Sequence, residues 1–402
     1  MFITALDLGS SQIKVLVAEI SKNNKLRLVD VFVFPSAGIR KGEIADIQEA
    51  TQVLSNVFSE VRKINKSALK NIFVNLGGKN VKIQNSRGIV AVSRADNEIY
   101  SDDAERAIKA SQAINISANR KIIHTIIQEF IVDGVDQIKN PVGMSGARLE
   151  VNSLIIDAFA PTYNDLCKSV EIAGGKIADV VYSPLASPYA VLSKNHKELG
   201  VVLIDIGFST TSMSVFEEDK LIGAKVFPIG SSNITNDLAI ALKSSIDTAE
   251  RLKISYGSAF SRDVSAKEKI DLHEVDESLK SIVSKKYIAE IIEVRLAEIF
   301  ELIHNELKLL GKNQLPSGAV LCGGGVKIDG IVDLAKHELK LPVHMANCEF
   351  DLFDSASQDV ASKIEDLEFA LPLGLLVYGC TRHMRPSAPL SWPAKILKYF
   401  MP

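Results

Sequence analysis

Two segments of the sequence repeat one pattern whose residues could bind a phosphate and a metal ion. Each is an apolar run ending in an aspartate, followed by a glycine, a hydroxyl-rich turn and a second apolar run, with Asp7 and Gly9 in the first copy and Asp205 and Gly207 in the second. Tight turns of this kind expose backbone N–H groups that can cradle a phosphate, and the aspartates can hold a hydrated Mg²⁺ between them. Either copy alone would also fit an ordinary β-hairpin. Because each copy opens one half of the 402-residue chain, we predict two related domains that face each other.

The length and composition of the chain limit the class of protein. A chain of 402 residues is too long for one hydrophobic core, so several domains are expected. The net charge of −3 gives no molecule-wide basic field, so we expect no nucleic-acid partner. The four cysteines show no CxxC spacing, which indicates thiols in a reducing compartment rather than a zinc site. The N-terminus has no basic segment before its apolar run, and no uncharged apolar stretch reaches the ~20 residues of a membrane-spanning helix. We therefore expect a cytoplasmic protein.

Hydrophobic periodicity predicts strands and helices throughout the chain. The expected strands are 2–8, 12–20, 26–34, 71–76, 122–132, 147–159, 201–206, 211–217, 221–228 and 318–322. The expected helices are 46–65, one beginning at Ser101, 166–173, 185–192, 234–255, 285–310 and 369–378. We also expect a hairpin over 80–92, and a surface loop and helix in the acidic stretch 349–368.

A third glycine-rich turn completes a recognisable set. The strand 318–322 ends in Gly323, Gly324 and Gly325 before a helix, and without Cβ atoms such a turn lets the backbone approach a nucleotide closely. Together with the two aspartate turns it resembles the ATPase signature shared by actin, Hsp70 and sugar kinases. That resemblance implies that Lys14, seven residues after Asp7, contacts the β- and γ-phosphates. The alternative for Lys14 is a solvated lysine on an edge strand.

Within this superfamily the chain resembles the FtsA family of bacterial cell-division proteins. The most specific stretch is a strand containing Gln128 and Glu129, followed by Lys139-Asn-Pro-Val-Gly-Met-Ser-Gly-Ala-Arg-Leu149. The resemblance implies an α/β, actin-like fold of two related domains around a nucleotide cleft, with an FtsA-type inserted subdomain. It divides the chain into a first core domain (1–79 and 160–198), the inserted subdomain (80–159), a second core domain (199–232 and 313–380), its helical subdomain (233–312), a linker (381–389) and an amphipathic membrane-targeting helix (390–402).

The resemblance also assigns the binding residues. The nucleotide-binding set is Gly9, Ser10, Ser11, Gln12, Lys14, Gly207, Ser209, Glu250, Lys253, Gly323, Gly324, Gly325 and Lys327, and the Mg²⁺ site is Asp7 and Asp205. Glu250 and Lys253 lie one helical turn apart, so both can face a ribose and adenine; the alternative is a surface ion pair. Small residues at Ala186, Ala190 and Gly374 would let two helices cross closely at the interdomain hinge.

Two departures from the superfamily pattern bear on catalysis. Phe208 and Ser209 replace glycines of the second turn, which narrows the backbone approach to the γ-phosphate. The water-positioning Gln or Glu of actin and Hsp70 aligns with Ser183, and serine orients an attacking water poorly. Because phosphoryl transfer depends on positioning and charge stabilisation, we expect tight nucleotide binding and at most slow ATP hydrolysis. We assign no catalytic residue and do not expect a metabolic enzyme.

The C-terminal segment has the pattern of an amphipathic helix. Beyond Cys380 it carries basic residues and no acid, and a helix from Ser391 would place apolar side chains on one face and lysines toward the other. The membrane-binding residues predicted from this pattern and from the family are Trp392, Lys395, Ile396, Lys398, Tyr399 and Phe400. The alternative is a terminal helix docked on its own domain.

These features favour an ATP-binding, actin-like cell-division protein that polymerises on the cytoplasmic membrane at the division site and tethers FtsZ filaments there. The partners implied by the resemblance are the FtsZ C-terminal peptide, further copies of the chain in a head-to-tail filament, an anionic membrane surface and other divisome proteins, with ATP and Mg²⁺ as ligands. One alternative is a PilM-like actin-related ATPase of type IV pilus assembly. Another is a phosphotransferase resembling sugar or acetate kinases, for which the sequence offers no convincing catalytic residue.

Overall fold

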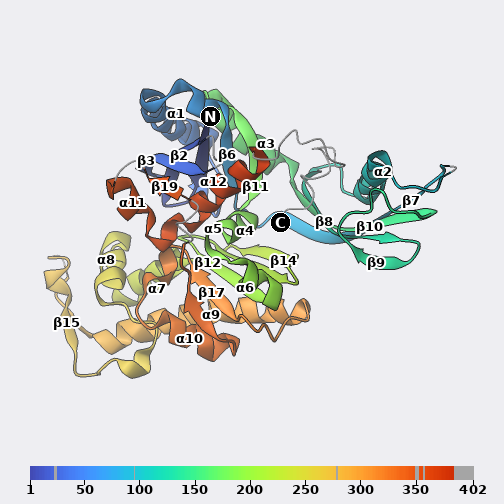
Figure 1. The fold of residues 1–402 in the computed structure, drawn as a ribbon. Helices are drawn as coiled ribbons and strands as arrows, with labels where there is room; N and C mark the ends of the chain where they lie inside the picture. The colour runs from blue at the N-terminus through green and yellow to red at the C-terminus, as the bar shows by residue number, and fades with distance from the viewer. Residues whose placement is uncertain (22–24, 95, 278, 349–352, 356–357, 384–402) are drawn as a thin grey trace.

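Two sheets with related strand orders form the body of the molecule (Figure 1). The computed structural model describes residues 1–21, 25–94, 96–277, 279–348, 353–355 and 358–383. The first sheet has the order β11-β6-β1-β2-β3-β19, from β1 (Phe2–Leu8), β2 (Gln12–Ile20), β3 (Leu26–Pro35), β6 (Ile72–Leu76), β11 (Ile177–Tyr182) and β19 (Phe353–Ser355). The second has the order β14-β13-β12-β17-β18, from β12 (Val201–Ile206), β13 (Thr211–Glu217), β14 (Lys220–Phe227), β17 (Ala319–Cys322) and β18 (Val343–Met345).

The two sheets repeat one topology. In each, three consecutive antiparallel strands are extended by a strand parallel to the first of them, β6 beside β1 and β17 beside β12. The register sets Asp7 opposite Lys14 across the first turn and Asp205 opposite Ser212 across the second. The prediction of two related domains is confirmed, and the repeat places both aspartates at the same point of their strands.

The first sheet is apolar on both faces because helices cover both. Ile13, Val15 and Val17 of β2 pack in the cluster that contains α1 (Ile47–Ile64) and α3 (Ala160–Ile172), whereas Leu16 and Ala18 pack with α12 (Ala370–His383). Figure 1 shows α1 and α12 on opposite sides of the sheet. Helix α1 begins where the Asp46 carboxylate accepts hydrogen bonds from the N–H groups of Gln48 and Glu49.

The second sheet is covered in the same way. Val202 and Ile204 of β12 pack with the helices of the second domain, and Val201 and Leu203 pack toward the hinge. The helices on the first side are α7 (Ser231–Leu242), α8 (Ile246–Tyr256), α9 (Lys285–Leu309) and α10 (Ile331–Leu339). A small hairpin of β15 (Lys269–Asp271) and β16 (Ile282–Ser284) extends this group, at the lower left of Figure 1.

The hinge lies where α12 crosses two short helices, α4 (Ser183–Ala186) and α5 (Pro188–Val191), between the two sheets. A Cβ on Gly374 would lie 2.0 Å from the carbonyl oxygen of Ala186, so the two backbones touch. Ala186 and Ala190 are both buried. The close crossing predicted from these small residues is therefore confirmed. The single helix predicted over 185–192 is wrong, because Pro188 begins a new helical turn.

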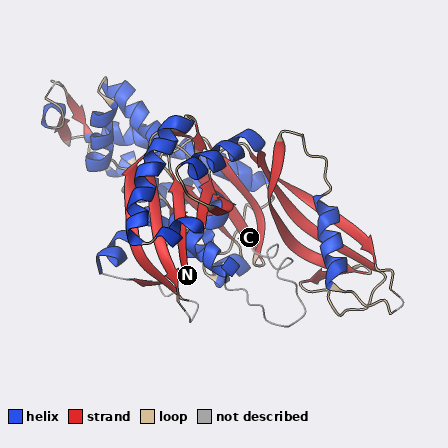
Figure 2. Cartoon of the chain, turned by 90° about the horizontal axis from the view of Figure 1, so that it is seen from above, coloured by secondary structure: helices blue, strands red, loops and turns tan. Residues whose placement is uncertain are grey.

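A separate four-stranded sheet projects from the body (Figures 1 and 2). Its order is β7-β10-β8-β9, from β7 (Val81–Ala91), β8 (Arg120–Val132), β9 (Val135–Ile138) and β10 (Arg148–Phe159), with α2 (Ser101–Gln112) packed on one face. The hairpin predicted over 80–92 is wrong, since β7 is one continuous strand. Gly88 does not turn the chain: a Cβ there would lie 2.0 Å from the carbonyl oxygen of Ala107, so the glycine lets α2 approach the strand.

The projecting sheet also touches the second domain. The Gln128 side chain donates a hydrogen bond of 3.0 Å to the carbonyl oxygen of Leu221 in β14, and Glu129 lies 3.4 Å from the Lys220 ammonium group. Side chains of β8, the strand with Gln128 and Glu129, therefore contact β14, which also lies against β7.

The predicted helix over 234–255 is divided into α7 and α8. Lys243 adopts a left-handed conformation at the end of α7, and the Ser245 hydroxyl accepts a hydrogen bond from the Thr248 N–H to begin α8. Likewise, Gly324–Lys327 form a 3₁₀ turn before α10 rather than its first turn. The remaining short elements are β4 (Ile39–Arg40), β5 (Glu43–Ile44), α6 (Lys194–Leu199), α11 (Gln358–Ile364) and 3₁₀ turns at Lys66–Lys70, Ser261–Asp263, Leu272–Glu274 and Leu367–Phe369.

Candidate functional site

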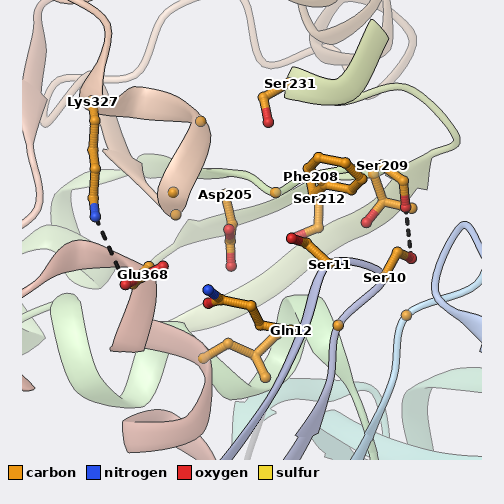
Figure 3. A pocket seen from close by; sticks show the side chains of 18 of the residues that line it. Ser10, Ser11, Gln12, Asp205, Phe208, Ser209, Ser212, Ser231, Lys327 and Glu368 are labelled. Atoms are coloured by element: carbon orange, nitrogen blue, oxygen red, sulfur yellow. Dashed lines mark hydrogen bonds and ion pairs between the residues drawn. The ribbon is translucent and has the colours of Figure 1, made fainter. Parts of the chain in front are cut away.

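A cavity of about 530 Å³ lies between the two domains, where the turns after β1 and β12 face each other (Figure 3). All residues predicted to bind nucleotide or metal line it: Asp7, Gly9, Ser10, Ser11, Gln12, Lys14, Asp205, Gly207, Ser209, Glu250, Lys253, Gly323, Gly324, Gly325 and Lys327. They come from both sheets and from α8, which are far apart in the sequence. The fold thus brings the whole predicted set together at one cavity.

The two hydroxyl-rich turns meet across the cavity. The Ser10 and Ser209 hydroxyl oxygens lie 2.7 Å apart and form a hydrogen bond, drawn as a dashed line in Figure 3. The Gly42 N–H donates to the Ser10 hydroxyl at 3.3 Å, so the β4–β5 hairpin supports the first turn. Phe208 stands beside Ser209 and is 39% exposed, which leaves its ring at the cavity rather than in a core.

The two aspartates line the cavity, where Asp7 is buried and Asp205 is half-buried. Burial raises the pKa of Asp7 to about 6, against the opposing effect of the nearby Lys14 ammonium group. Burial also raises the pKa of Asp205, whose carboxylate accepts a 3.1 Å hydrogen bond from the Ser187 hydroxyl. Removal of water thus disfavours negative charge at both carboxylates, which makes this a place where a bound cation would be stabilised.

The donor set fits a magnesium ion held mainly by water and phosphate. Within the described part of the chain, no group of three or more His, Cys, Asp and Glu side chains is placed to hold a metal directly. Asp7 and Asp205 supply two carboxylates, and Mg²⁺ in nucleotide sites commonly keeps several waters and uses only one or two carboxylates together with phosphates. The residues present therefore suit hydrated Mg²⁺ bound with a nucleotide.

The third glycine turn needs its glycines for two different reasons. Gly323 has φ of +92°, and a Cβ there would lie 2.3 Å from an Asp205 carboxylate oxygen. Gly325 packs against Ile206, where a Cβ would lie 2.5 Å from its side chain. A Cβ on Gly324 would reach only ordinary contact, 3.7 Å from a Glu368 carboxylate oxygen, so this position faces open space in the cavity.

Glu368 is a site residue that the sequence analysis missed. Its carboxylate lies 3.7 Å from the Lys327 ammonium group (Figure 3). It also lies 3.5 Å from the Lys14 ammonium group, so one acid joins lysines from the two domains. Lys327 is also paired with Asp366. The signal available was the acidic stretch 349–368, which was expected to be a surface loop and helix; its last residues instead form part of the cavity wall. Lys14 is not a solvated edge residue, because its side chain is 12% exposed.

Glu250 and Lys253 do form an ion pair, but it lies in the cavity wall. The Lys253 ammonium group is 2.7 Å from the Glu250 carboxylate and donates to the Thr235 hydroxyl at 3.0 Å. The Lys253 side chain is 6% exposed, so the pair is not a solvated surface pair. Helix α8 thus presents a carboxylate and an ammonium group in fixed positions to the cavity.

Asn75 is a second missed residue, at the end of β6. Its side-chain oxygen accepts a 2.7 Å hydrogen bond from the Leu8 N–H, and its nitrogen lies 3.1 Å from an Asp7 carboxylate oxygen and 3.4 Å from the Ser183 hydroxyl. The signal in the sequence was a single asparagine inside an otherwise apolar strand. Ser183, which the resemblance aligns with the water-positioning residue, lies on the cavity wall.

The predicted membrane-binding residues Trp392, Lys395, Ile396, Lys398, Tyr399 and Phe400 lie outside the described residues. Among the described helices, none is both long enough and apolar enough to cross a membrane.

Two protein-family models match the chain. The model described as "Cell division protein FtsA" matches residues 202–374, and the model described as "SHS2 domain inserted in FTSA" matches residues 78–157. The second match coincides with the projecting sheet and α2.

Characterised relatives match over nearly the whole chain. The chain is 32% identical over 378 residues to the cell division protein FtsA of Pseudomonas aeruginosa, covering 94% of this chain and 89% of the relative. It is 34% identical over 376 residues to that of Bacillus subtilis, covering 94% of this chain and 83% of the relative.

Solved structures show the same fold at low sequence identity. A chain of the PilM–PilN type IV pilus biogenesis complex aligns with a TM-score of 0.67 at 18% identity, covering 94% of this chain and 98% of that one. MreB5 of Spiroplasma citri bound to ADP aligns with a TM-score of 0.55 at 14% identity, covering 94% and 96%. A MamK double helical filament aligns with a TM-score of 0.51 at 12% identity, covering 93% and 97%. These similarities confirm the expected actin-like fold.

Proposed function

Because the chain belongs to the FtsA family of cell division proteins, we propose that it binds ATP with Mg²⁺, polymerises on the cytoplasmic face of the cell membrane and tethers FtsZ filaments there. The observation that carries the proposal is the cavity between the two aspartate turns. Every residue predicted to bind the nucleotide lines this cavity, some from the first domain and some from the second. A ligand in this position would bridge the domains. Nucleotide binding would therefore favour one arrangement of the domains over others.

Different residues of the cavity would bind different parts of the nucleotide. The turns around Gly9 and Gly207 and the ammonium group of Lys14 would hold the β- and γ-phosphates, since backbone N–H groups and a lysine both stabilise phosphate charge. Bound Mg²⁺ would neutralise phosphate charge, with Asp7 and Asp205 holding its water ligands. Glu250, Lys253, the turn Gly323–Gly325 and Lys327 would enclose the adenosine.

The proposed division of the chain follows the sheets except at β19, which lies in the range 313–380 but pairs with β3 in the first sheet. The first core domain is 1–79 and 160–198, the inserted subdomain 80–159, the second core domain 199–232 and 313–380, and the helical subdomain 233–312. In support, β7 begins at Val81 and β10 ends at Phe159, the bounds of the projecting sheet. The linker 381–389 and the helix 390–402 complete the division, although α12 continues through the first three linker residues to His383.

Polymerisation is supported by the family and by the filament-forming neighbour MamK, which shares the fold. A head-to-tail contact that does not close on itself generates an open filament. We propose that the inserted subdomain of one molecule meets the next molecule, and that the tail binds anionic lipid through Trp392, Lys395, Ile396, Lys398, Tyr399 and Phe400. The PilM-like alternative is not favoured, because the match to the PilM–PilN complex, at 18% identity, supports only the shared fold.

The test is a lipid-monolayer assay with the full chain, ATP and Mg²⁺, scored by electron microscopy for filaments and by fluorescence for recruitment of an FtsZ C-terminal peptide. We expect filaments and recruitment with the wild type, and neither filaments nor ordered recruitment after removal of residues 80–159. The two ends of the removed segment lie close together, because the Phe159 N–H donates a 3.2 Å hydrogen bond to the Asn80 carbonyl oxygen. A scrambled peptide is the control for recruitment. Filaments that persist without the inserted subdomain would overturn the polymerisation contact, and wild-type layers that never recruit the peptide would overturn the tethering role.

A further inference from the structure

Asn75 is buried at the base of the cavity, in a strand that is otherwise apolar. It is 5% exposed, and every residue of β6 is buried. A buried amide destabilises a fold unless its donors and acceptor are satisfied. Here the parallel pairing of β6 with β1 carries Asn75 to the point where β1 ends in Asp7 and Leu8, so all of its groups can find partners.

The hydrogen bonds determine which way the amide faces. The Leu8 N–H can only donate, so the atom 2.7 Å from it must be the Asn75 oxygen. The amide nitrogen must then face the Asp7 carboxylate at 3.1 Å and the Ser183 hydroxyl at 3.4 Å. Both of those groups line the cavity. Asn75 therefore joins the backbone of the first turn, a proposed metal-holding carboxylate and the hydroxyl at the water-positioning place.

We infer that Asn75 is a positioning residue for the Mg²⁺–nucleotide complex, an inference that rests on the proposed nucleotide site. By donating to one oxygen of Asp7, the amide orients that carboxylate toward the cavity, where it can receive a water ligand of Mg²⁺. By donating also to Ser183, the amide occupies one of the two acceptor positions of that hydroxyl and leaves its proton directed to other partners. Asn75 does not itself touch the nucleotide in this assignment.

The alternative is that Asn75 is purely structural and serves only to satisfy the Leu8 N–H. Two neutral substitutions test these roles. Asn75→Leu keeps nearly the same shape and adds no charge but cannot donate to Asp7 or Ser183, whereas Asn75→Ala also removes side-chain volume. Asn71→Ala is the matched control, since Asn71 begins the same segment and its amide donates to the Phe2 carbonyl oxygen at 3.2 Å, outside the cavity lining.

The experiment measures the affinity of the full chain for a fluorescent ATP analogue, with Mg²⁺ and with EDTA, and records thermal unfolding without nucleotide to check folding. The readout is the Mg²⁺ gain, the ratio of the two dissociation constants. We expect Asn75→Leu and Asn75→Ala to lower this gain roughly tenfold, the effect of losing a hydrogen bond to a charged group, with the affinity in EDTA within about twofold of wild type. Asn71→Ala should keep the wild-type gain.

The outcomes are distinct. A gain in Asn75→Leu or Asn75→Ala that equals or exceeds that of the wild type would overturn the positioning role. So would an equal loss of affinity with Mg²⁺ and with EDTA, which would indicate a structural role. A wild type that binds no nucleotide under either condition would instead overturn the proposed nucleotide site itself.

Discussion

At the scale of single residues, the cavity contains charged groups whose removal from water costs folding free energy. Asp7 is 8% exposed, and its carboxylate faces the Asn75 amide and lies near Lys14 and Asp205. Groups arranged to bind a cation are commonly destabilising when the cation is absent. The nucleotide-free protein should therefore carry a stability penalty that can be measured at Asp7.

We predict that Asp7→Asn stabilises the nucleotide-free protein at pH 7. The pKa of Asp7 is raised from 3.8 to about 6, so the folded state favours the protonated carboxyl, and its contribution is favourable at low pH and lost as pH rises through about 6. A shift of this size corresponds to about 3 kcal/mol at neutral pH. Thermal unfolding at pH 4 and pH 7 measures the effect. The variant should gain stability relative to wild type mainly at pH 7, while Asp136→Asn, at an exposed position, should change little. A difference that is equal at both pH values would contradict the assignment.

The wall position of Ser183 gives a prediction for turnover. Its hydroxyl lines the cavity and accepts a hydrogen bond from Asn75, and if Ser183 takes the water-positioning role implied by the resemblance, it offers only a weak base to an attacking water. We expect phosphate release under multiple turnover to be far slower than about 1 s⁻¹, the low end of ordinary enzymes. A heat-treated sample and the Gly324→Trp variant supply the background. Steady-state release near or above that rate would show that another residue orients the water.

At the scale of elements, strand pairing fixes the two aspartate turns, whereas the C-terminal tail is inferred from its sequence. The two turns are held by antiparallel pairs on either side, so their geometry is part of the sheets. The tail has only its sequence pattern, an apolar face with Lys395 and Lys398 toward the other side. Burial of four apolar side chains stabilises membrane binding at about 25 cal/mol per Å², and each nearby cation adds roughly 1 kcal/mol on an anionic surface. Single molecules should therefore attach reversibly, and filaments should attach firmly through many tails.

We predict that Trp392→Glu releases the protein from anionic liposomes in a sedimentation assay, because it places a charge on the apolar face. High salt should weaken the wild type through the lysines. Since Trp392 is the only tryptophan in the chain, its fluorescence reports directly on lipid contact. Liposomes of neutral lipid in place of anionic lipid are the matched control. If the Glu variant still pellets with the liposomes, or if the fluorescence is unchanged by lipid, the tail is docked on its own domain instead.

At the scale of the whole molecule, the nucleotide site exists only where the two domains meet. Hydrogen bonds and ion pairs already cross the cavity, between Ser10 and Ser209 and between Lys14 and Glu368. A bound ligand adds to these contacts and stabilises the folded chain by mass action, by about 2.7 kcal/mol at a hundredfold excess over its dissociation constant. Affinity and thermal stability should consequently change together.

We predict that Asp205→Ala and Gly324→Trp weaken ATP binding in the presence of Mg²⁺ and reduce the thermal stabilisation that ATP confers. The first removes one of the two carboxylates, and the second directs an indole into open cavity space, since a Cβ at Gly324 meets nothing closer than 3.7 Å. Calorimetric titration with ATP and Mg²⁺ measures the affinity, and thermal unfolding with and without ATP measures the stabilisation. Asp136→Asn should bind as the wild type does. Unchanged affinity in both cavity variants would contradict the location of the site.

Much of the fold could be predicted from local sequence. Most strands of both sheets and helices α1 and α9 follow from apolar periodicity, and the two aspartate turns follow from their glycines and hydroxyl side chains. The sheet strands β11, β18 and β19 were not predicted. The places that failed are those where a distant contact decides the conformation. Gly88 looked like a turn because glycine often makes one, but here it admits the backbone of α2. Pro188 and Ser245 divide helices whose apolar pattern continues across the break.

The sequence by itself determined the repeat, the three glycine turns and the list of candidate binding residues, because these depend on short-range backbone chemistry and on similarity within a family. Only the tertiary structure decided that these residues share one cavity and that Asn75 and Glu368 belong with them. Asn75 is 68 residues from Asp7, and Glu368 comes from the opposite end of the chain to Lys14. Their partners are set by the parallel pairing of β6 with β1 and by the approach of the two domains at the hinge. No pattern of neighbouring residues encodes such contacts, because their energy arises only when the separate segments are packed together.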